Sequence, residues 1–258
     1  MVVACGGIHT PVLLQASGLG GIGSQVGRNL ALHPGFRVFA RFDEDVRGWA
    51  GSMQSAFSDA YEHEDVLLNS LFIPASVIVA TMPGAGPELM ARADQVANIA
   101  VFGAQIHDEG GGVVWRNPFG REPISLYRCT DRDHRAMRTG IRALAETFTA
   151  AGAKELFLPV LGSHGMTPDE ARRFDLDRVP GAKLECSSQH PMGTCRMGRS
   201  AADSAVDPYG KSWDVDELYV ADASILPSSL GVNPQLTVMA LATRIAWHLR
   251  ERRPAQIH

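Results

Sequence analysis

The feature that most constrains the fold is a short apolar run, Leu218–Asp222, followed after a loop by Asn233-Pro234. The run predicts a buried parallel strand, because such strands are covered on both faces and are apolar throughout. Asparagine is a favoured N-cap and proline is tolerated in the first turn, so Asn233-Pro234 predicts the start of a helix, which we expect to end near Arg250. Val2–Gly7 predicts a second buried strand that runs into a glycine turn. We therefore expect an α/β fold.

The middle of the chain predicts antiparallel strands and one long helix. Apolar residues at helical spacing indicate a helix from Asp131 to Ala151, which Gly152 ends. Glycines at 110–112 lie between two apolar stretches. This pattern predicts a hairpin that joins the strands on either side. Thr10-Pro11 predicts the start of an earlier helix, and residues 43–90 predict loops and short elements. The predicted strands are 36–40, 99–106, 113–115, 123–127 and 155–158.

Composition excludes several classes of protein. The 24 basic and 28 acidic residues give a net charge of −4, and no basic patch indicates a nucleic-acid partner. No run of about 18 apolar residues occurs, so we expect no membrane span. Four cysteines without a Cys-x-x-Cys pair are too few for a disulfide framework and lack zinc-site spacing, so we expect no metal site. We expect a cytoplasmic location.

Two short motifs allow functions that the rest of the chain does not favour. Gly18-x-Gly20-x-x-Gly23, with Asp43 beyond it, matches the dinucleotide-binding fingerprint and would indicate a nicotinamide-dependent dehydrogenase. The segment before Gly18 is better explained as a helix, and no Tyr-x-x-x-Lys pair is present. Ser163-His164 resembles part of a hydrolase nucleophile elbow, but a leucine replaces the first glycine.

His190 is the strongest candidate for chemistry. It stands in the segment 187–198, whose many glycines and small residues are typical of backbone that approaches another group closely. Histidine suits proton transfer near neutral pH, although a structural role is an equally good interpretation of the local composition. A helix that starts at Asn233 would present free N–H groups and partial positive charge to an anion, as other capped helices do. Cys195 is interpreted as a buried, inert thiol.

Three stretches resemble the glucose–methanol–choline (GMC) family of flavoprotein oxidoreductases, in the family's order. Residues 6–20 are similar to the family's second signature, with Gly7 where Ala, Ser, Thr or Pro is usual. Residues 190–198 (HPMGTCRMG) resemble the active-site histidine segment, and residues 207–237 resemble the closing segment of the FAD domain. The middle and end of the chain are most similar to long-chain alcohol oxidases and, less closely, to cholesterol oxidases.

The resemblance implies a chemistry and a set of site residues. The reaction would be FAD-dependent oxidation of an alcohol, a CH–OH donor, to a carbonyl by hydride transfer to flavin N5. His190 would be the general base, and Asn233 would hydrogen-bond the substrate oxygen. The substrate would be a small-molecule alcohol of a long-chain or sterol-like kind. The implied cofactor-binding residues are Asp222, Ala223, Asn233, Pro234, Gln235 and Thr237.

The resemblance also implies a domain organisation. Residues 1–42 and 187–258 would be segments of the FAD domain, and residues 43–186 an α+β substrate-binding domain with helices on one face of a sheet. The resemblance places Gly18 and Gly20 in the second signature. The family's N-terminal βαβ unit, whose own Gly-x-Gly-x-x-Gly holds the ADP half of FAD, is not in this sequence. We therefore expect a C-terminal fragment whose N-terminal FAD-binding half is missing. Two alternatives stay open: an NAD(P)-dependent dehydrogenase that uses the glycines at 18–23, and a truncated chain that is inactive or depends on a partner.

Overall fold

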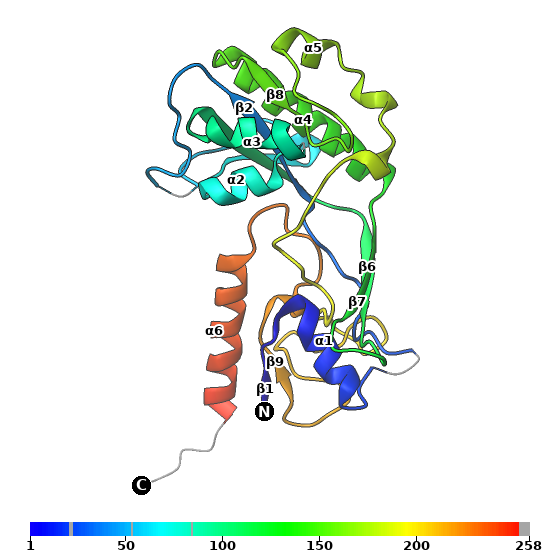
Figure 1. Ribbon diagram of the computed structural model, residues 1–258. Coiled ribbons are helices and arrows are strands. Elements are labelled where there is room, and N and C mark those ends of the chain that lie inside the picture. The colour runs from blue at the N-terminus through cyan, green and yellow to red at the C-terminus, as the bar shows by residue number, and fades with distance from the viewer. Residues whose placement is uncertain (21–22, 53, 84, 253–258) are drawn as a thin grey trace. The chain divides into compact units, whose positions relative to one another are not determined.

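The computed structural model describes residues 1–20, 23–52, 54–83 and 85–252, which form two compact units (Figure 1). The first unit combines residues 1–33 and 108–130 with the chain from Ser188 onwards, and the second combines 34–107 with 131–187. These units differ from the expected domain boundaries in two places. The strand near residue 40 belongs to the second unit, and the segment 108–130 belongs to the first. Residues 253–258 of the expected last segment lie outside the described residues.

The second unit is built on an antiparallel five-stranded sheet. Its strands lie in the order β3-β4-β5-β2-β8. Strand β5 is central. Strand β2 lies between β5 and the edge strand β8, with Phe39 opposite Val101 on one side and opposite Phe157 on the other. The strands are β2 (Gly35–Arg41), β3 (Phe57–Ser58), β4 (Val66–Ser70), β5 (Ile99–Ile106) and β8 (Glu155–Phe157).

Helices cover both faces of this sheet, so the expectation of helices on one face is wrong. Because side chains alternate along a strand, Phe36 and Phe39 of β2 point to opposite faces. Phe36 lies against the long helix α4 (Asp131–Ala150), since a Cβ on Gly140 would lie 2.5 Å from its ring. Phe39 lies in a cluster with Ile78 and Met82, from α2 (Ala75–Thr81) and the residue after it. Both faces are therefore buried, which explains the nearly continuous apolar run of β5.

The first unit contains the N-terminal and C-terminal segments from which the sequence predicts an α/β fold. Strand β1 (Val2–Val3) pairs in parallel with β9 (Tyr219–Val220). Strand β9 is buried as predicted, whereas in β1 Val3 is buried and Val2 is exposed. Strands β6 (Gly111–Trp115) and β7 (Ile124–Arg128) form a separate antiparallel pair. Helix α6 (Gln235–Arg252) closes the described part of the chain.

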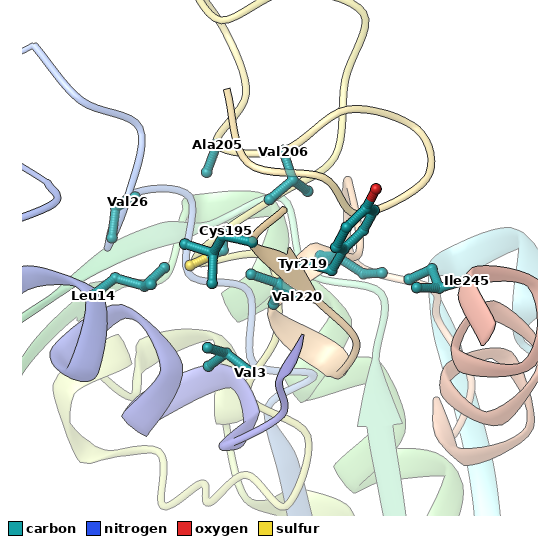
Figure 2. Packing of buried hydrophobic residues seen from close by; sticks show 11 residues of the cluster. Val3, Leu14, Val26, Cys195, Ala205, Val206, Tyr219, Val220 and Ile245 are labelled. Carbon is teal, nitrogen blue, oxygen red and sulfur yellow. The ribbon is translucent and has the colours of Figure 1, made fainter. Parts of the chain in front are cut away.

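Figure 2 shows the core of the first unit, in which side chains from four distant parts of the sequence meet. Val3 and Leu14 come from the N-terminal end, and Cys195 comes from the candidate histidine segment. Val220 lies on β9, and Ile245 is the buried residue of α6. The histidine segment is therefore anchored in a hydrophobic core on its C-terminal side.

Helix α1 (Gly6–Ala16) has Cys5 as its N-cap, five residues before the predicted N-cap Thr10, so that prediction is wrong. Pro11 lies inside the helix and has no N–H to donate to the carbonyl of Gly7, its partner one turn earlier. The hydroxyl of Thr194 donates to that carbonyl instead, at 2.6 Å. A distant side chain thus compensates the internal proline, which sequence periodicity alone does not reveal.

The predicted hairpin around residues 110–112 is also wrong. Strand β5 ends at Ile106 and belongs to the five-stranded sheet, whereas β6 pairs only with β7 among the described strands. The glycines therefore lie just after the point in the sequence where the second unit ends and the first resumes. Strand β4, inside the region expected to hold loops and short elements, pairs along its whole length with β5.

The remaining elements are short. They are the helices α3 (Gly86–Asp94) and α5 (Pro168–Arg173) and the 3-10 helices η1 (Glu62–Glu64), η2 (Val96–Asn98), η3 (Leu176–Arg178), η4 (Gly181–Lys183) and η5 (Ala223–Ile225). Among the described residues, none of the helices combines the length and the apolar character that crossing a membrane requires.

Candidate functional site

His190 lies half-buried on a segment that several hydrogen bonds fix in place. Its backbone N–H donates to the hydroxyl of Ser188, at 3.0 Å, and that hydroxyl donates to the carbonyl of Leu32. Two residues later, Met192 forms an antiparallel bridge with Ala31. Burial lowers the pKa of His190. The imidazole is therefore neutral near neutral pH and able to accept a proton.

The glycine-rich composition after His190 reflects close backbone approach, as expected. Gly193 has φ of +84°, and a Cβ there would lie 2.4 Å from the carbonyl oxygen of Asn29. The carbonyl of Thr194 accepts the N–H of Gly27, at 2.7 Å. The segment is thus fixed against residues 27–31 as well as against helix α1.

Cys195 behaves as the sequence predicts. Its side chain is completely buried, and burial raises the pKa of the thiol to about 12. Because the thiolate is the nucleophilic form of cysteine, this residue is inert at neutral pH. Cys195 therefore contributes to the hydrophobic core and not to catalysis.

The residues at the carboxyl end of β9 order the turn that follows the strand. Asp222 caps η5 by accepting the N–H of Ser224, at 2.7 Å. Its other carboxylate oxygen accepts from the N–H of Gly6, at 2.9 Å, and from the hydroxyl of Thr10, at 2.5 Å. The carbonyl of Ala223 accepts from the N–H of Gly193, at 3.2 Å. Asp222 and Ala223 therefore join β9 to helix α1 and to the histidine segment.

Helix α6 starts one residue later than predicted. Its first helical hydrogen bond runs from the N–H of Val238 to the carbonyl of Pro234, so Pro234 takes the N-cap position and Asn233 precedes it. Within the described chain, the exposed side chain of Asn233 makes no hydrogen bond. The predicted capping role of Asn233 is therefore wrong, and its amide is available to a ligand. Gln235 is exposed and Thr237 is half-buried in the first turn.

His33 links the His190 segment to the loop that leads to Asn233. The rings of His33 and His190 meet edge to face, with centroids 5.6 Å apart. The buried Nε2 of His33 accepts the N–H groups of Leu230, at 2.8 Å, and Gly231, at 2.9 Å. Since an accepting nitrogen carries no proton, the proton of the His33 ring lies on Nδ1. One buried histidine thus contacts the ring of His190 and binds the backbone of the loop that leads to Asn233.

Sequence reasoning did not assign a role to His33 or to Asp108. Asp108 is buried and accepts hydrogen bonds from the backbone N–H groups of Leu32 and His33. The only local sign was that His33 precedes a proline, a position with restricted backbone geometry. The partners of both residues lie far along the chain, so neither role follows from local pattern.

The two competing motifs lack the structure that their chemistry requires. The dinucleotide fingerprint needs a strand before its glycines and a helix after them. Here Gly18 follows helix α1, where its N–H and that of Leu19 bond back to the carbonyls of Gln15 and Leu14. This pattern is a Schellman motif, a common helix end. Ser163 donates its hydroxyl to the carbonyl of Leu158, and the neighbouring His164 is exposed.

Comparisons with known proteins agree with the sequence resemblance. The N-terminal model of the GMC oxidoreductase family matches residues 1–35, and the C-terminal model matches residues 116–242. An uncharacterized GMC-type oxidoreductase of Mycobacterium tuberculosis is 37% identical over 247 residues, which cover 95% of this chain and 39% of that protein. A long-chain-alcohol oxidase of Arabidopsis thaliana is 30% identical over 279 residues, covering 98% of this chain and 36% of that protein.

Solved structures show the same fold. Pyridoxine 4-oxidase from Mesorbium loti superposes with a TM-score of 0.66 at 21% identity, over 98% of this chain and 52% of that one. A formate oxidase of Aspergillus oryzae superposes with a TM-score of 0.67 at 19% identity, over 98% and 54%. The chain thus spans 39% of the mycobacterial relative and about half of these structures. The family models that match both parts of the sequence, together with the relatives that cover nearly all of it, show that this chain belongs to the GMC oxidoreductase family.

Proposed function

We propose that this chain carries the catalytic residues of an FAD-dependent oxidoreductase that oxidises an alcohol to a carbonyl. The observation that carries the proposal is the connection of half-buried His190 and the Asn233 loop to one histidine, His33. Relatives support the substrate class. Besides the plant long-chain-alcohol oxidase, a 2-methyl-1,2-propanediol dehydrogenase of Mycolicibacterium austroafricanum is 43% identical over 63 residues, 24% of this chain and 11% of that protein.

The start of helix α6 fits the flavin end of FAD, which the Aspergillus oryzae formate oxidase is described as carrying. Gln235, Leu236 and Thr237 open an 18-residue helix, and their N–H groups have no helical partner. Pro234 before them contributes no N–H but has the fixed backbone angle that suits a helix start. Bound FAD would supply the hydride acceptor, its N5, and a ring that gains negative charge on reduction. The helix start would stabilise that charge through its free N–H groups and partial positive charge.

Asp222 and Ala223 fit a supporting part of the same site. They lie at the carboxyl end of the parallel strand β9, where ligands bind in open α/β sheets. The carboxylate oxygens of Asp222 are already bonded to Ser224, Gly6 and Thr10. We therefore propose that these residues contact a cofactor through ordered backbone rather than through the carboxylate.

His190 and Asn233 would divide the work on the substrate. The neutral imidazole of His190 would accept the hydroxyl proton as the alcohol is oxidised. The free amide of Asn233 would donate a hydrogen bond to the same oxygen and hold it in place. Both groups must then lie within hydrogen-bond reach of one oxygen atom. For the substrate we propose a long-chain or sterol-like alcohol.

We also propose that the chain works with an N-terminal FAD-binding half, because the mycobacterial and plant relatives described above are more than twice as long. The test is to read the coding DNA upstream of Met1 in frame. A continuing frame with Gly-x-Gly-x-x-Gly after a predicted strand supports the proposal. A stop codon immediately upstream would favour an inactive or partner-dependent chain.

The activity itself is tested by anaerobic reduction. Protein from the whole reading frame is loaded with FAD and mixed without oxygen with a straight-chain alcohol, with cholesterol and with a matched alkane as the control. We expect an alcohol, and not the alkane, to bleach the visible flavin band and to yield the aldehyde or ketone. Folded protein that takes up FAD but is reduced by no alcohol would refute the proposed substrate class. Folded protein that takes up no FAD would refute the proposed cofactor.

A further inference from the structure

Asp108 is a buried carboxylate whose hydrogen-bonding capacity is completely used within the first unit. Its Oδ1 accepts from the N–H of His33, at 3.1 Å, and from the hydroxyl of Ser229, at 2.5 Å. Its Oδ2 accepts from the N–H of Leu32, at 3.0 Å, and from the hydroxyl of Tyr127, at 2.5 Å. An ionised carboxylate offers about four acceptor positions. Asp108 is therefore matched to donors from three separate segments.

These donors also keep the carboxyl group ionised. Burial alone raises the pKa of Asp108, but the hydrogen bonds from Ser229, Tyr127, Leu32 and His33 together lower it below the ordinary value. A buried ionised group is retained only where such bonds compensate its lost hydration. Asp108 therefore carries a buried negative charge that these four donors compensate.

Two connections lead from Asp108 to the proposed catalytic residues. The first is Ser229, which lies four residues before Asn233 on the loop that enters helix α6. The second is His33, whose backbone has φ of +49°, a conformation that non-glycine residues seldom adopt. The bond from its N–H to Asp108 supports this conformation. The His33 ring then accepts the N–H groups of Leu230 and Gly231 and faces His190.

We infer that Asp108 is a positioning residue that fixes Asn233 through Ser229 and His190 through His33. This inference rests on the proposed function, because it assigns the network to the two residues that act on the substrate. Tyr127 forms the third connection, to strand β7, which contains neither catalytic residue. A variant at Tyr127 can therefore serve as the control for a variant at Ser229.

The test compares Ser229→Ala with Tyr127→Phe in the FAD-loaded protein. Each variant removes one hydroxyl that donates to Asp108 over the same distance, 2.5 Å. We expect similar losses of stability in urea, but a fall in kcat of about 10- to 100-fold only for Ser229→Ala, since displacing a reacting group by 1 Å costs about that much. Equal kcat values for the two variants, whether lowered or unchanged, would overturn the inference.

A second measurement needs neither substrate nor turnover. With ¹⁵N-labelled histidine, the His33 signals are assigned by their loss in His33→Gln, and we expect an unprotonated Nε2 in the wild-type protein. Asp108→Asn should change that nitrogen signal, whereas Asp133→Asn, at a buried aspartate of the second unit, should not. A His33 signal that Asp108→Asn leaves unchanged contradicts the His33 connection. If His190→Gln kept full turnover, the catalytic assignment would fail while this nitrogen measurement would still report on the network.

Discussion

The substitution Gly193→Ala tests how the histidine segment is held in place. Two separate effects, a positive φ and a close contact with Asn29, should each lower the free energy of unfolding at this position. Gly193 has φ of +84°, which an L-residue adopts at a cost of about 1–2 kcal/mol. A Cβ would also lie 2.4 Å from the carbonyl oxygen of Asn29, well inside van der Waals contact. Overpacking of this kind costs about 1–3 kcal/mol. The sum predicts a loss of about 2–5 kcal/mol in the free energy of unfolding.

Gly18→Ala is the matched control in the same unit. Gly18 has φ of +81°, and a Cβ there would meet nothing within 4 Å. This variant carries only the backbone cost, so it should lose about 1–2 kcal/mol. Urea unfolding followed by circular dichroism gives both values, provided that the slope with denaturant is unchanged. If Gly193→Ala were no less stable than Gly18→Ala, the close approach of residues 193 and 29 would be refuted.

Two further predictions concern ionisable groups. The pKa of Asp108 is lowered in the folded protein, so this group contributes stability that is fully present above its unfolded value of 3.8 and is lost as pH falls through the folded value. Asp108→Asn should therefore reduce stability at neutral pH and weaken its dependence on pH below about 4, measured by urea unfolding at a series of pH values; an unchanged acid dependence would contradict this. Cys195 should resist a thiol reagent in the folded protein while exposed Cys5 and Cys186 react, and should become reactive in denaturant. Labelling of Cys195 as fast as Cys5 would contradict its burial.

Much of the fold follows from local pattern. Helix α4 was predicted within a residue, because its apolar positions recur at helical spacing and Gly152 follows it. Strands β2, β5, β7 and β8 coincide with the apolar runs that predicted them. These elements carry their signal in consecutive residues, so no knowledge of partners is needed to find them.

The errors arise where distant residues decide the local structure. Helix α1 continues through Pro11 because Thr194 supplies the donor that proline lacks. Strand β4 has only partly buried side chains over most of its length, so its sequence lacks a clear alternation, and its pairing with β5 defines it. Asn233 is not the N-cap because the first helical bond ends on Pro234.

Local sequence pattern likewise identified one part of the candidate site and missed another. His190 stood out through its unusual glycine-rich surroundings and through the family resemblance. The network of His33 and Asp108 depends on bonds between residues about 75, 120 and 200 positions apart, such as those from Ser229 to Asp108 and from Leu230 to His33. Sequence pattern within a window cannot report such pairs, and the structure was needed to identify them.

The central claim is that His190 accepts the proton of the alcohol, and replacing it is the most direct test. In the FAD-loaded protein, anaerobic flavin reduction by an alcohol is followed for the wild type, for His190→Ala and for His164→Ala, which changes an exposed histidine of the second unit. We predict that His190→Ala slows reduction by about 10²–10⁴-fold, the usual contribution of a general base, while its FAD content stays the same. His164→Ala should reduce at the wild-type rate. A His190→Ala protein that is reduced as fast as the wild type would contradict the assigned role.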